Sequence, residues 1–459
     1  MLGHLLLPEI RELIRSGDFS VLHYALRELT APDLAELINE VPAGDKAVLF
    51  RLAPRSLAGE TFEHLELTDQ EELLRAFGER ETADILNVMS PDDRTQLLEE
   101  LPAEATRRLL TLLSPEEMQV AKTLLGYPED SIGRRMTPDY VAIRSDLNVE
   151  QTLSHVRRFG RASETLDVLY VVDEQGHLED DLQTRELLVA PLDKPIADLM
   201  SNEVVSLMAT DDQETAVTAF KKYGATALPV TDSQGKLLGI VTVDDVLHVA
   251  EEEATEDIHK LGGLEALDMP YMATPFLEMV RKRAGWLVIL FVGELFTATA
   301  MTHFADEQKR AAVLGFFVPL IISSGGNSGS QAASLMIRAL ALGEVGLIDW
   351  WRVVRRELAS GVALGSILGI LGFLRITIWS QFSTVYGEHW FLVAVAIAFS
   401  LVGVVLWGTI SGSMLPFILK RLGADPATSS APFVATLVDV TGLIIYFTVA
   451  SIILRGTLL

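Results

Sequence analysis

Apolar residues gather in the last part of the chain, where they form runs long enough to cross a lipid bilayer. A transmembrane helix needs about 20 mostly apolar residues. Five runs meet this requirement, at residues 286–304, 311–337, 358–379, 390–419 and 432–454. The sequence therefore predicts an all-α membrane domain over residues 281–459 with five spans.

Basic residues in the connections between these runs predict the orientation of the spans. Arg281–Arg283 precede the first run, Arg338 and Arg352 lie between the second and third, and Lys420 and Arg421 lie between the fourth and fifth. Cytoplasmic loops carry the excess of Lys and Arg in membrane proteins. We therefore expect a multi-pass protein of the cytoplasmic (inner) membrane, with a cytoplasmic N-terminus and, after five spans, a C-terminus outside.

Short helices are predicted throughout residues 1–131. Three helix starts recur, each with a hydroxyl followed three residues later by a carboxylate: Thr68–Glu71, Ser90–Asp93 and Ser114–Glu117. This spacing is typical of an N-cap, and a proline occupies the first helical position in the second and third starts. We expect an all-α helical-repeat domain that packs through its leucines and has no chemistry of its own.

Residues 132–245 contain an internal repeat, with copies at 132–196 and 197–245. Residues 136–143 align with 200–207, and residues 171–178 align with 230–237. Each copy is predicted to run strand, helix, strand, Gln-Gly turn, strand and helix. The repeat and its closing segment Gly239–Asp245 resemble the tandem cystathionine β-synthase (CBS) pair, which is an α/β module.

The resemblance to CBS domains leaves two interpretations of this module open. In such modules the Thr and Asp of the closing motif can hold an adenosine ribose, which here implies Thr242 and Asp245 as tentative nucleotide-binding residues and ATP as a possible ligand. The first copy departs from the pattern, because the acidic segment Leu178–Leu182 stands where a glycine and an apolar strand are expected. A scaffold without a nucleotide is the alternative.

Charge and composition exclude several classes of ligand. The chain has a formal net charge of −26, and its excess of carboxylates lies in residues 1–280. Nucleic acid is excluded as a partner, because binding to phosphates depends on Lys and Arg. The chain has no cysteine, which excludes disulfides, thiolate metal sites and cysteine nucleophiles. Oxygen-coordinated divalent cations are the expected ligands.

Residues 246–280 join the repeat to the first span and are predicted to form an acidic linker helix. Asp245, Glu253 and Glu256 share one broad helical face, with Asp257 beside it. Two interpretations stay open here. The run is either a solvated face or a cation sensor, since like charges next to the membrane domain oppose close packing until a cation neutralises them.

Three polar features interrupt the apolar runs. Asp439 lies in the fifth span and Glu294 lies in the first. The second span contains Pro319 and the small polar segment Ser323–Gln331, where we expect non-helical backbone that is buried in protein or wet. A carboxylate at membrane depth costs on the order of several kcal/mol unless it is paired, solvated or next to a cation. Asp439 is therefore predicted to be functional.

Four motifs together resemble those of the MgtE-type magnesium channels. They are Ala254–Gly262, Gly325–Gln331, Met414–Phe417 and Val434–Gly442, and they follow the helical repeat and the CBS pair in that family's order. The resemblance covers essentially the whole chain. It implies a homodimer in the lipid bilayer, whose second and fifth spans line one central pore.

The resemblance also implies which residues line that pore. Asp439 would face hydrated Mg²⁺, and the backbone carbonyls of Ala435 and Ala431 would complete the pore mouth. The family often has Asn at the position of Ala431, so the chain departs from the pattern there. The remaining candidate pore residues are Gly325, Gly326, Asn327 and Glu294.

Regulatory cation sites follow from the same resemblance, position by position. The candidate metal ligands, besides Asp439, are Glu60, Asp92, Asp212, Glu214, Asp245, Glu253, Glu256, Asp257 and Asp425. Gln96, Gly224 and His248 stand where the family pattern is acidic, so some of these sites are expected to be weaker or displaced.

We therefore expect a Mg²⁺-selective, Mg²⁺-gated channel for magnesium uptake that closes when cytosolic Mg²⁺ binds the acidic sites, and no enzymatic activity. One alternative is a CBS-regulated, ion-coupled exporter of divalent cations, with Glu294 and Asp439 as a proton-coupling pair. A more distant alternative is an intramembrane serine protease, because Gly326–Gly329 has a Gly-x-Ser-Gly pattern, although His303 and His389 lie at span ends.

Overall fold

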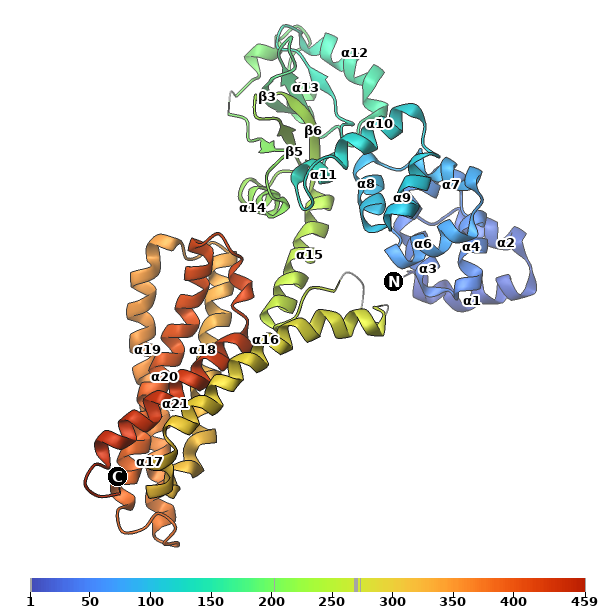
Figure 1. Ribbon diagram of the computed structural model, residues 1–459. Coiled ribbons are helices and arrows are strands. Elements are labelled where there is room, and N and C mark those ends of the chain that lie inside the picture. Colours follow the sequence, from blue (N-terminus) through green and yellow to red (C-terminus); the bar gives the residue numbers. More distant parts are fainter. Residues whose placement is uncertain (1, 202, 268–270, 273, 459) are drawn as a thin grey trace. The chain divides into compact units, whose positions relative to one another are not determined.

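The computed structural model describes residues 2–201, 203–267, 271–272 and 274–458. The chain divides into two compact units, Met1–Glu252 and Glu253–Leu459 (Figure 1). The first unit contains the helical repeat and the paired α/β module, and the second contains the membrane helices. This is the multidomain class that the sequence predicts.

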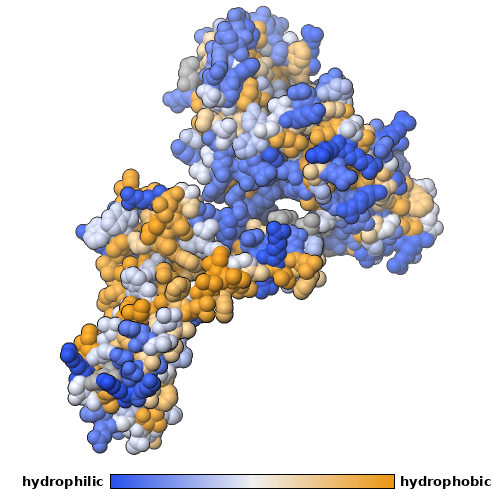
Figure 2. Space-filling model, in the orientation of Figure 1, coloured by the Kyte–Doolittle hydropathy of each residue, from blue (hydrophilic) through white to orange (hydrophobic). Residues whose placement is uncertain are grey.

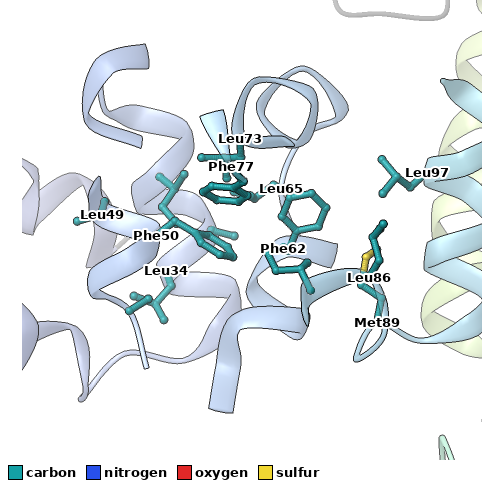
Figure 3. Close-up of a cluster of buried hydrophobic side chains, with 14 of the residues drawn as sticks. Leu34, Leu49, Phe50, Phe62, Leu65, Leu73, Phe77, Leu86, Met89 and Leu97 are labelled. Atoms are coloured by element: carbon teal, nitrogen blue, oxygen red, sulfur yellow. The ribbon is translucent and has the colours of Figure 1, made fainter. Parts of the chain in front are cut away.

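Ten short helices build the amino-terminal part of the first unit among the described residues. They are α1 (Leu2–Ser16), α2 (Phe19–Leu26), α3 (Ala31–Glu40), α4 (Ala43–Leu52), α5 (Ala58–Glu63), α6 (Leu67–Ala76), α7 (Glu79–Leu86), α8 (Pro91–Glu100), α9 (Ala103–Leu110) and α10 (Pro115–Leu124). Their apolar faces form one core, in which Phe50 packs against Phe62 and Phe77 (Figure 3). The predicted packing role of the leucines is confirmed, since Leu49, Leu73 and others are fully buried.

Two of the three predicted helix starts are confirmed. Ser90 and Ser114 are the N-caps of α8 and α10, each followed by proline, and the Ser114 hydroxyl accepts a hydrogen bond from the Glu117 amide at 3.2 Å. The prediction that Thr68 caps a helix is wrong. The backbone amides of Asp69 and Gln70 already donate to the Glu66 carbonyl, so α6 begins at Leu67 and Thr68 lies inside its first turn.

The internal repeat folds as two copies of the same small sheet. The first copy contains α11 (Ile132–Arg135), β1 (Ala142–Ile143), α12 (Val149–Phe159), β2 (Val168–Val172), β3 (Leu178–Gln183) and α13 (Thr184–Val189). The second contains β4 (Leu207–Met208), α14 (Gln213–Tyr223), β5 (Ala227–Thr231), β6 (Leu237–Thr242) and the start of α15 (Val243–Leu261). In each, a parallel pair of strands is followed by an antiparallel pair.

The acidic segment of the first copy is a strand despite its sequence. Asp180 pairs with Val171 in β3 and β2, as Gly239 pairs with Val230 in β6 and β5. The Asp180 side chain is fully buried and accepts hydrogen bonds from the amide and hydroxyl of Ser201, at 2.5 and 3.1 Å. The departure from the apolar pattern therefore serves to fix the segment that leads into the second copy.

The linker between the repeat and the membrane helices is only partly helical. Helix α15 ends at Leu261 and α16 begins at Phe276, so the expectation of one helix over residues 246–280 is wrong. Gly263 has a φ of +73°, a left-handed conformation that commonly ends helices. Part of the predicted range, residues 268–270 and 273, lies outside the described residues.

Within the described part of the second unit, five helices are long and apolar enough to span a membrane, which agrees with the predicted number. They are α16 (Phe276–His303), α18 (Val318–Ala341, preceded by the 3-10 turn Ala312–Phe317), α19 (Trp350–Ser380), α20 (Trp390–Arg421) and α21 (Ala431–Ile453), with the short α17 (Ala305–Arg310) after α16. Figure 2 shows apolar residues gathered over the surface of these helices. Several helices extend beyond the apolar runs, because charged residues continue a helix outside the hydrocarbon layer.

Helix α18 is continuous through Ser323–Gln331, so the prediction of non-helical backbone there is wrong. Pro319 lies in the first turn of α18, where a missing amide breaks no intrahelical hydrogen bond. The glycines of this segment are buried against neighbouring helices. Packing therefore outweighs their low helix propensity.

Candidate ion pore and cytoplasmic acidic cluster

Two glycines from α18 and two from α20 bring these helices into backbone contact. A Cβ atom added at Gly412 would lie 2.0 Å from the Gly329 carbonyl oxygen, and one added at Gly408 would lie 2.5 Å from the Gly325 carbonyl oxygen. Small residues permit such close approach between membrane helices. The crossing fixes α18, and with it the polar segment 323–331, inside the helix bundle.

Helix α18 also runs along α21, where it faces the predicted pore residues. A Cβ atom added at Gly326 would lie 3.3 Å from Oδ1 of Asp439 and 3.4 Å from the Cβ of Ala435. One turn further on, the Ser330 hydroxyl donates to the Ala431 carbonyl at 3.0 Å. The structure thus brings Gly326 together with Asp439 and Ala435, along one side of α21.

The other candidate pore residues have different surroundings. A Cβ at Gly325 would meet Val404 and Val438, so this glycine serves helix packing away from Asp439. Asn327 is exposed, and its amide donates to Ser323 at 3.3 Å. Glu294 is exposed on α16 and is the carboxylate whose charge acts on Asp439. Helix α16 packs on α21 here, since Gly293 closely approaches Thr436.

Ser330 is a site residue that the sequence analysis missed. Its hydrogen bond occupies one side of the carbonyl that the resemblance assigns to the pore mouth. The spacing in the sequence could have indicated this residue, because Ser330 lies four residues after Gly326 and therefore on the same face of a helix. Helical spacing carries no information for a segment that is predicted to be irregular backbone, as this one is.

In the first unit, six carboxylates form a group that we call the acidic cluster: Glu63, Asp92, Asp93, Glu164, Asp244 and Asp245. They come from α5, the first turns of α8 and α15, and the segment before β2. Helix N-termini favour negative charge, which explains the positions of Asp92, Asp93, Asp244 and Asp245. The sequence analysis had named Asp92 and Asp245 from this group and missed the other four.

Burial and repulsion from neighbouring carboxylates disfavour the charged forms of four members, Glu63, Asp92, Glu164 and Asp245. Burial, with the charges of Asp93 and Glu164 added, raises the pKa of Glu63 to about 7. Burial, with Asp245 and Asp93 added, raises the pKa of Glu164 to about 7. Burial also raises the pKa of Asp245 to about 6, against a stabilising hydrogen bond from Thr242. A bound cation would remove this electrostatic cost.

Asp92 is the most strongly affected member of the acidic cluster. Its side chain is 7% exposed, and burial followed by the charge of Asp245 raises its pKa well above the usual range. Its Oδ1 is buried without a hydrogen-bond partner among the described residues. Within the described ranges, however, no three acidic or histidine side chains close around a single point as a metal site would require.

The remaining candidate metal ligands do not form one group, although Glu256 and Asp425 both form ion pairs with Lys260. Glu60 is exposed on α5, and Asp212 and Glu214 are exposed at the start of α14, where Asp212 caps the helix. Glu253 and Asp257 lie on α15, in the second unit. Asp425 lies between α20 and α21 and forms an ion pair within that unit.

Two departures from the family pattern have a local structural explanation. Gly224 ends α14 in a left-handed conformation, with a φ of +62°, which favours glycine over an acidic residue. The Gln96 amide lies 3.4 Å from the Glu252 carboxylate and can donate to it, where a second carboxylate would repel. His248 is exposed on α15, and nothing in the structure explains it.

A cavity of 770 Å³ lies between the two copies of the α/β module. Its lining includes Gln183, Arg185, Tyr223 and Thr226, and its volume is within the range of small-molecule sites. Neither Thr242 nor Asp245 lines it. The Thr242 hydroxyl instead donates to Asp245 at 2.5 Å, and Asp245 belongs to the acidic cluster. The tentative nucleotide residues and the cavity are therefore separate features.

Comparison with known proteins agrees with this layout. Family models match at residues 29–130 (MgtE intracellular N domain), 196–252 (CBS domain) and 318–449 (MgtE, divalent cation transporter). The magnesium transporter MgtE of Thermus thermophilus is 38% identical over 450 residues, which cover 97% of this chain and 98% of that relative. This chain belongs to the MgtE family.

Further MgtE proteins extend the similarity. The magnesium transporter MgtE of Bacillus subtilis is 30% identical over 96% of this chain and 95% of its own length. The crystal structure of the cytosolic domain of the Mg²⁺ channel MgtE in complex with ATP is 37% identical, covers 52% of this chain and 98% of its own, and has a TM-score of 0.50. The predicted resemblance and fold class are confirmed. Like other MgtE proteins, the chain is a multi-pass membrane protein with cytoplasmic amino-terminal domains.

Proposed function

We propose that this MgtE protein is a Mg²⁺-selective channel for magnesium uptake, which closes when cytosolic Mg²⁺ binds its acidic sites. The observation that carries the proposal is the close approach of Gly326 on α18 to Asp439 on α21, which places a carboxylate of one apolar helix against the polar segment of another. The T. thermophilus and B. subtilis relatives are named as magnesium transporters, which supports Mg²⁺ as the ion.

Uptake through such a pore needs no ATP hydrolysis. A divalent cation that enters across an inward-negative potential gains about 4.6 kcal/mol per 100 mV, twice the value for a single charge. Mg²⁺ dehydrates reluctantly, so a pore that recognises the hydrated ion avoids a large barrier. In this proposal Asp439 attracts the hydrated ion, and the carbonyls of Ala435 and Ala431 accept hydrogen bonds from its water shell.

The acidic cluster supports a regulatory role for Mg²⁺. Its carboxylates are ionised at a cost, and Asp92 has a buried oxygen without a hydrogen bond in the described structure. Mg²⁺ at such groups would remove the repulsion and let the cytoplasmic domains pack tightly. The same proposal includes Glu60, Asp212, Glu214, Glu253, Glu256, Asp257 and Asp425 as further ligands.

The test is Mg²⁺ uptake into liposomes that contain the purified full-length protein and an internal Mg²⁺ indicator. Asp439→Ala should lower the rate of uptake at least a hundredfold. The matched control is Asp306→Ala, which removes a carboxylate whose side chain is 82% exposed in the α16–α18 connection, and it should behave like wild type. Uptake at the wild-type rate by Asp439→Ala would refute the pore assignment.

One observation keeps an ion-coupled exporter as a second candidate. Glu294 on α16 and Asp439 on α21 belong to helices that pack together where Gly293 approaches Thr436, and a proton relay needs two carboxylates on neighbouring helices. An exporter of this kind would carry Mg²⁺ only as fast as a pH gradient drives it, whereas flux through a channel follows the Mg²⁺ gradient and the voltage. Flux that stops when the pH gradient is collapsed would favour the exporter.

The protease alternative receives little support. Ser328, in the Gly-x-Ser-Gly segment, is 8% exposed, and its hydroxyl has no hydrogen-bond partner in the part of the chain that the structure describes. A serine nucleophile needs an adjacent base. We propose that the protein has no enzymatic activity.

Assembly, orientation and nucleotide binding complete the proposal. We propose a homodimer in the cytoplasmic (inner) membrane with the C-terminus outside. The exposed polar residues Ser323, Asn327 and Gln331 lie at four-residue spacing on α18 and would face a shared, wet pore instead of lipid. We also propose ATP as a ligand of the 770 Å³ cavity, because a solved MgtE cytosolic domain is a complex with ATP.

A further inference from the structure

A lysine links the end of the linker helix to the connection between two membrane helices. Lys260 lies in the last turn of α15, and its ammonium nitrogen is 2.5 Å from Oε1 of Glu256 and 2.7 Å from Oδ2 of Asp425. The three side chains are 28%, 38% and 37% exposed, respectively, so ions in solution can reach them. A single positive charge thus lies between two carboxylates from different elements of the second unit.

Asp425 is held in place independently of the lysine. Its Oδ1 accepts a hydrogen bond from the Ala427 amide at 2.8 Å, which caps the 3-10 turn Pro426–Thr428. Only Oδ2 is directed to Lys260. The carboxylate would therefore keep its orientation if the ammonium group left, and it remains available to another cation.

The segment that follows α15 also contacts the first turn of α21. Gly263, two residues beyond α15, is so close to Trp286 that an added Cβ would lie 2.6 Å from the indole ring and 3.2 Å from Pro432. Trp286 donates a hydrogen bond to Ser430 at 3.0 Å, and Ser430 is the N-cap of α21. A change in how α15 is held at Asp425 would thus act directly on the start of the helix that carries Asp439.

We propose that Lys260 is a tethered competitor of Mg²⁺: it occupies the position between Glu256 and Asp425 when Mg²⁺ is scarce, and it sets the Mg²⁺ concentration at which the protein closes. This inference rests on the proposed function and adds a residue that neither the family resemblance nor the acidic cluster identifies. Mg²⁺ must displace the ammonium group before it can bridge the two carboxylates.

Charge and coordination explain why the two cations exclude each other. Mg²⁺ takes oxygen ligands only, and an ammonium group has no lone pair to offer. Two positive charges at the same pair of oxygens also repel.

The proposal predicts opposite effects for the two sides of the ion pair. Lys260→Gln removes the competitor and leaves both carboxylates, so closure should need less Mg²⁺. Asp425→Asn removes a ligand, so closure should need more. If Lys260 were only a structural tie that holds α15 in the closed position, both substitutions would weaken closure and shift the Mg²⁺ dependence in the same direction.

The test is an electrical recording on the full-length protein in a planar bilayer, with Mg²⁺ varied on the cytoplasmic side. A partly exposed ion pair contributes up to about 1 kcal/mol of interaction free energy, so Lys260→Gln should lower the half-inhibitory Mg²⁺ concentration about fivefold. Lys260→Arg keeps the positive charge and should stay within twofold of wild type. Lys309→Gln, which removes the lysine of an exposed ion pair after α16, is the matched charge control.

A second measurement covers the case in which a variant opens poorly. Cleavage of the linker by proteinase K, followed against Mg²⁺ concentration in detergent, should show the same fivefold shift for Lys260→Gln and for Lys260→Met. An unchanged or higher half-inhibitory concentration in these variants, with wild type inhibited normally, would overturn the role of Lys260. Wild-type protein without current or without Mg²⁺ inhibition would instead contradict the proposed function.

Discussion

The two units of this protein place carboxylates in opposite environments. In the membrane unit, Asp439 lies on an apolar helix beside the bare backbone of Gly326, and Glu294 is the other carboxylate that acts on it. In the first unit, six carboxylates lie close together, four of them at helix starts, and burial with mutual repulsion raises the pKa values of Glu63, Asp92, Glu164 and Asp245. A carboxylate with few charged neighbours among apolar helices suits an ion that passes. A crowded group suits an ion that binds and stays, because only a bound cation cancels the repulsion.

The largest effect is expected from the scaffold that positions Asp439. Gly412→Leu places a side chain against the backbone of Gly329. Helix α18 can make room for this side chain only by separating from α20. We expect loss of the folded membrane unit, seen as aggregation on size-exclusion chromatography and no Mg²⁺ uptake. Gly315→Ala is the control, since a Cβ there meets nothing within 4 Å. A folded, transporting Gly412→Leu protein would show that this contact does not hold the pore together.

The acidic cluster predicts that Mg²⁺ binding by the cytoplasmic domains depends on pH. Glu63 and Glu164 have pKa values of about 7, so they are mostly protonated at pH 6 and mostly ionised at pH 8. Mg²⁺ binds the ionised form, and the Mg²⁺ concentration that half-protects the cytoplasmic domains from protease should therefore rise roughly tenfold from pH 8 to pH 6. Glu63→Gln combined with Glu164→Gln should flatten this dependence. A pH-independent wild type would contradict the raised pKa values.

Without Mg²⁺, the stability of the cytoplasmic domains should fall as the pH rises. The folded-state pKa values of these carboxylates exceed the unfolded ones, so the folded state binds more protons between about pH 4 and pH 7. This contribution to stability is present below pH 4 and is lost as the pH rises through 7. In chelator, the unfolding temperature of the cytoplasmic domains should fall as the pH rises from 6 to 8, and Mg²⁺ should restore it.

The smallest effect is expected at Ser330. Ser330→Ala removes the hydroxyl that donates to the Ala431 carbonyl and leaves the helix contact intact. The carbonyl then accepts one hydrogen bond fewer from the protein and is more open to the water shell of a passing ion, so the Mg²⁺ flux should change only about threefold, in proportion to one hydrogen bond of about 0.7 kcal/mol. A change beyond thirtyfold in flux would mean that Ser330 belongs to the ion path itself.

The sequence predicted local features well and long-range contacts poorly. The five spans, the repeated α/β copies and the caps at Ser90 and Ser114 follow from periodicity and spacing within a few residues. Glu63 and Glu164 are about 100 positions apart, and no local pattern indicates that they meet. The close pairing of Gly408 and Gly412 with α18 likewise depends on tertiary packing.

The wrong prediction over residues 323–331 and the unexpected acidic composition of a predicted strand have the same physical origin. The segment 323–331 is rich in glycine and serine, which lower helix propensity, yet contact with α20 and α21 keeps it helical. The first α/β copy has carboxylates in a strand, and the buried hydrogen bonds of Asp180 to Ser201 compensate for them. In both cases the deciding partner is distant in sequence.

The central claim is that one carboxylate serves permeation and the crowded carboxylates serve gating. It is tested most directly by recording maximal Mg²⁺ current and half-inhibitory cytosolic Mg²⁺ on the same bilayers for Asp439→Asn and for the double variant Asp92→Asn with Asp245→Asn. We predict that Asp439→Asn abolishes the current, and that the double variant keeps the maximal current while its half-inhibitory concentration rises tenfold or more. A double variant that loses current with unchanged inhibition, or an Asp439→Asn protein that still conducts, would contradict the account.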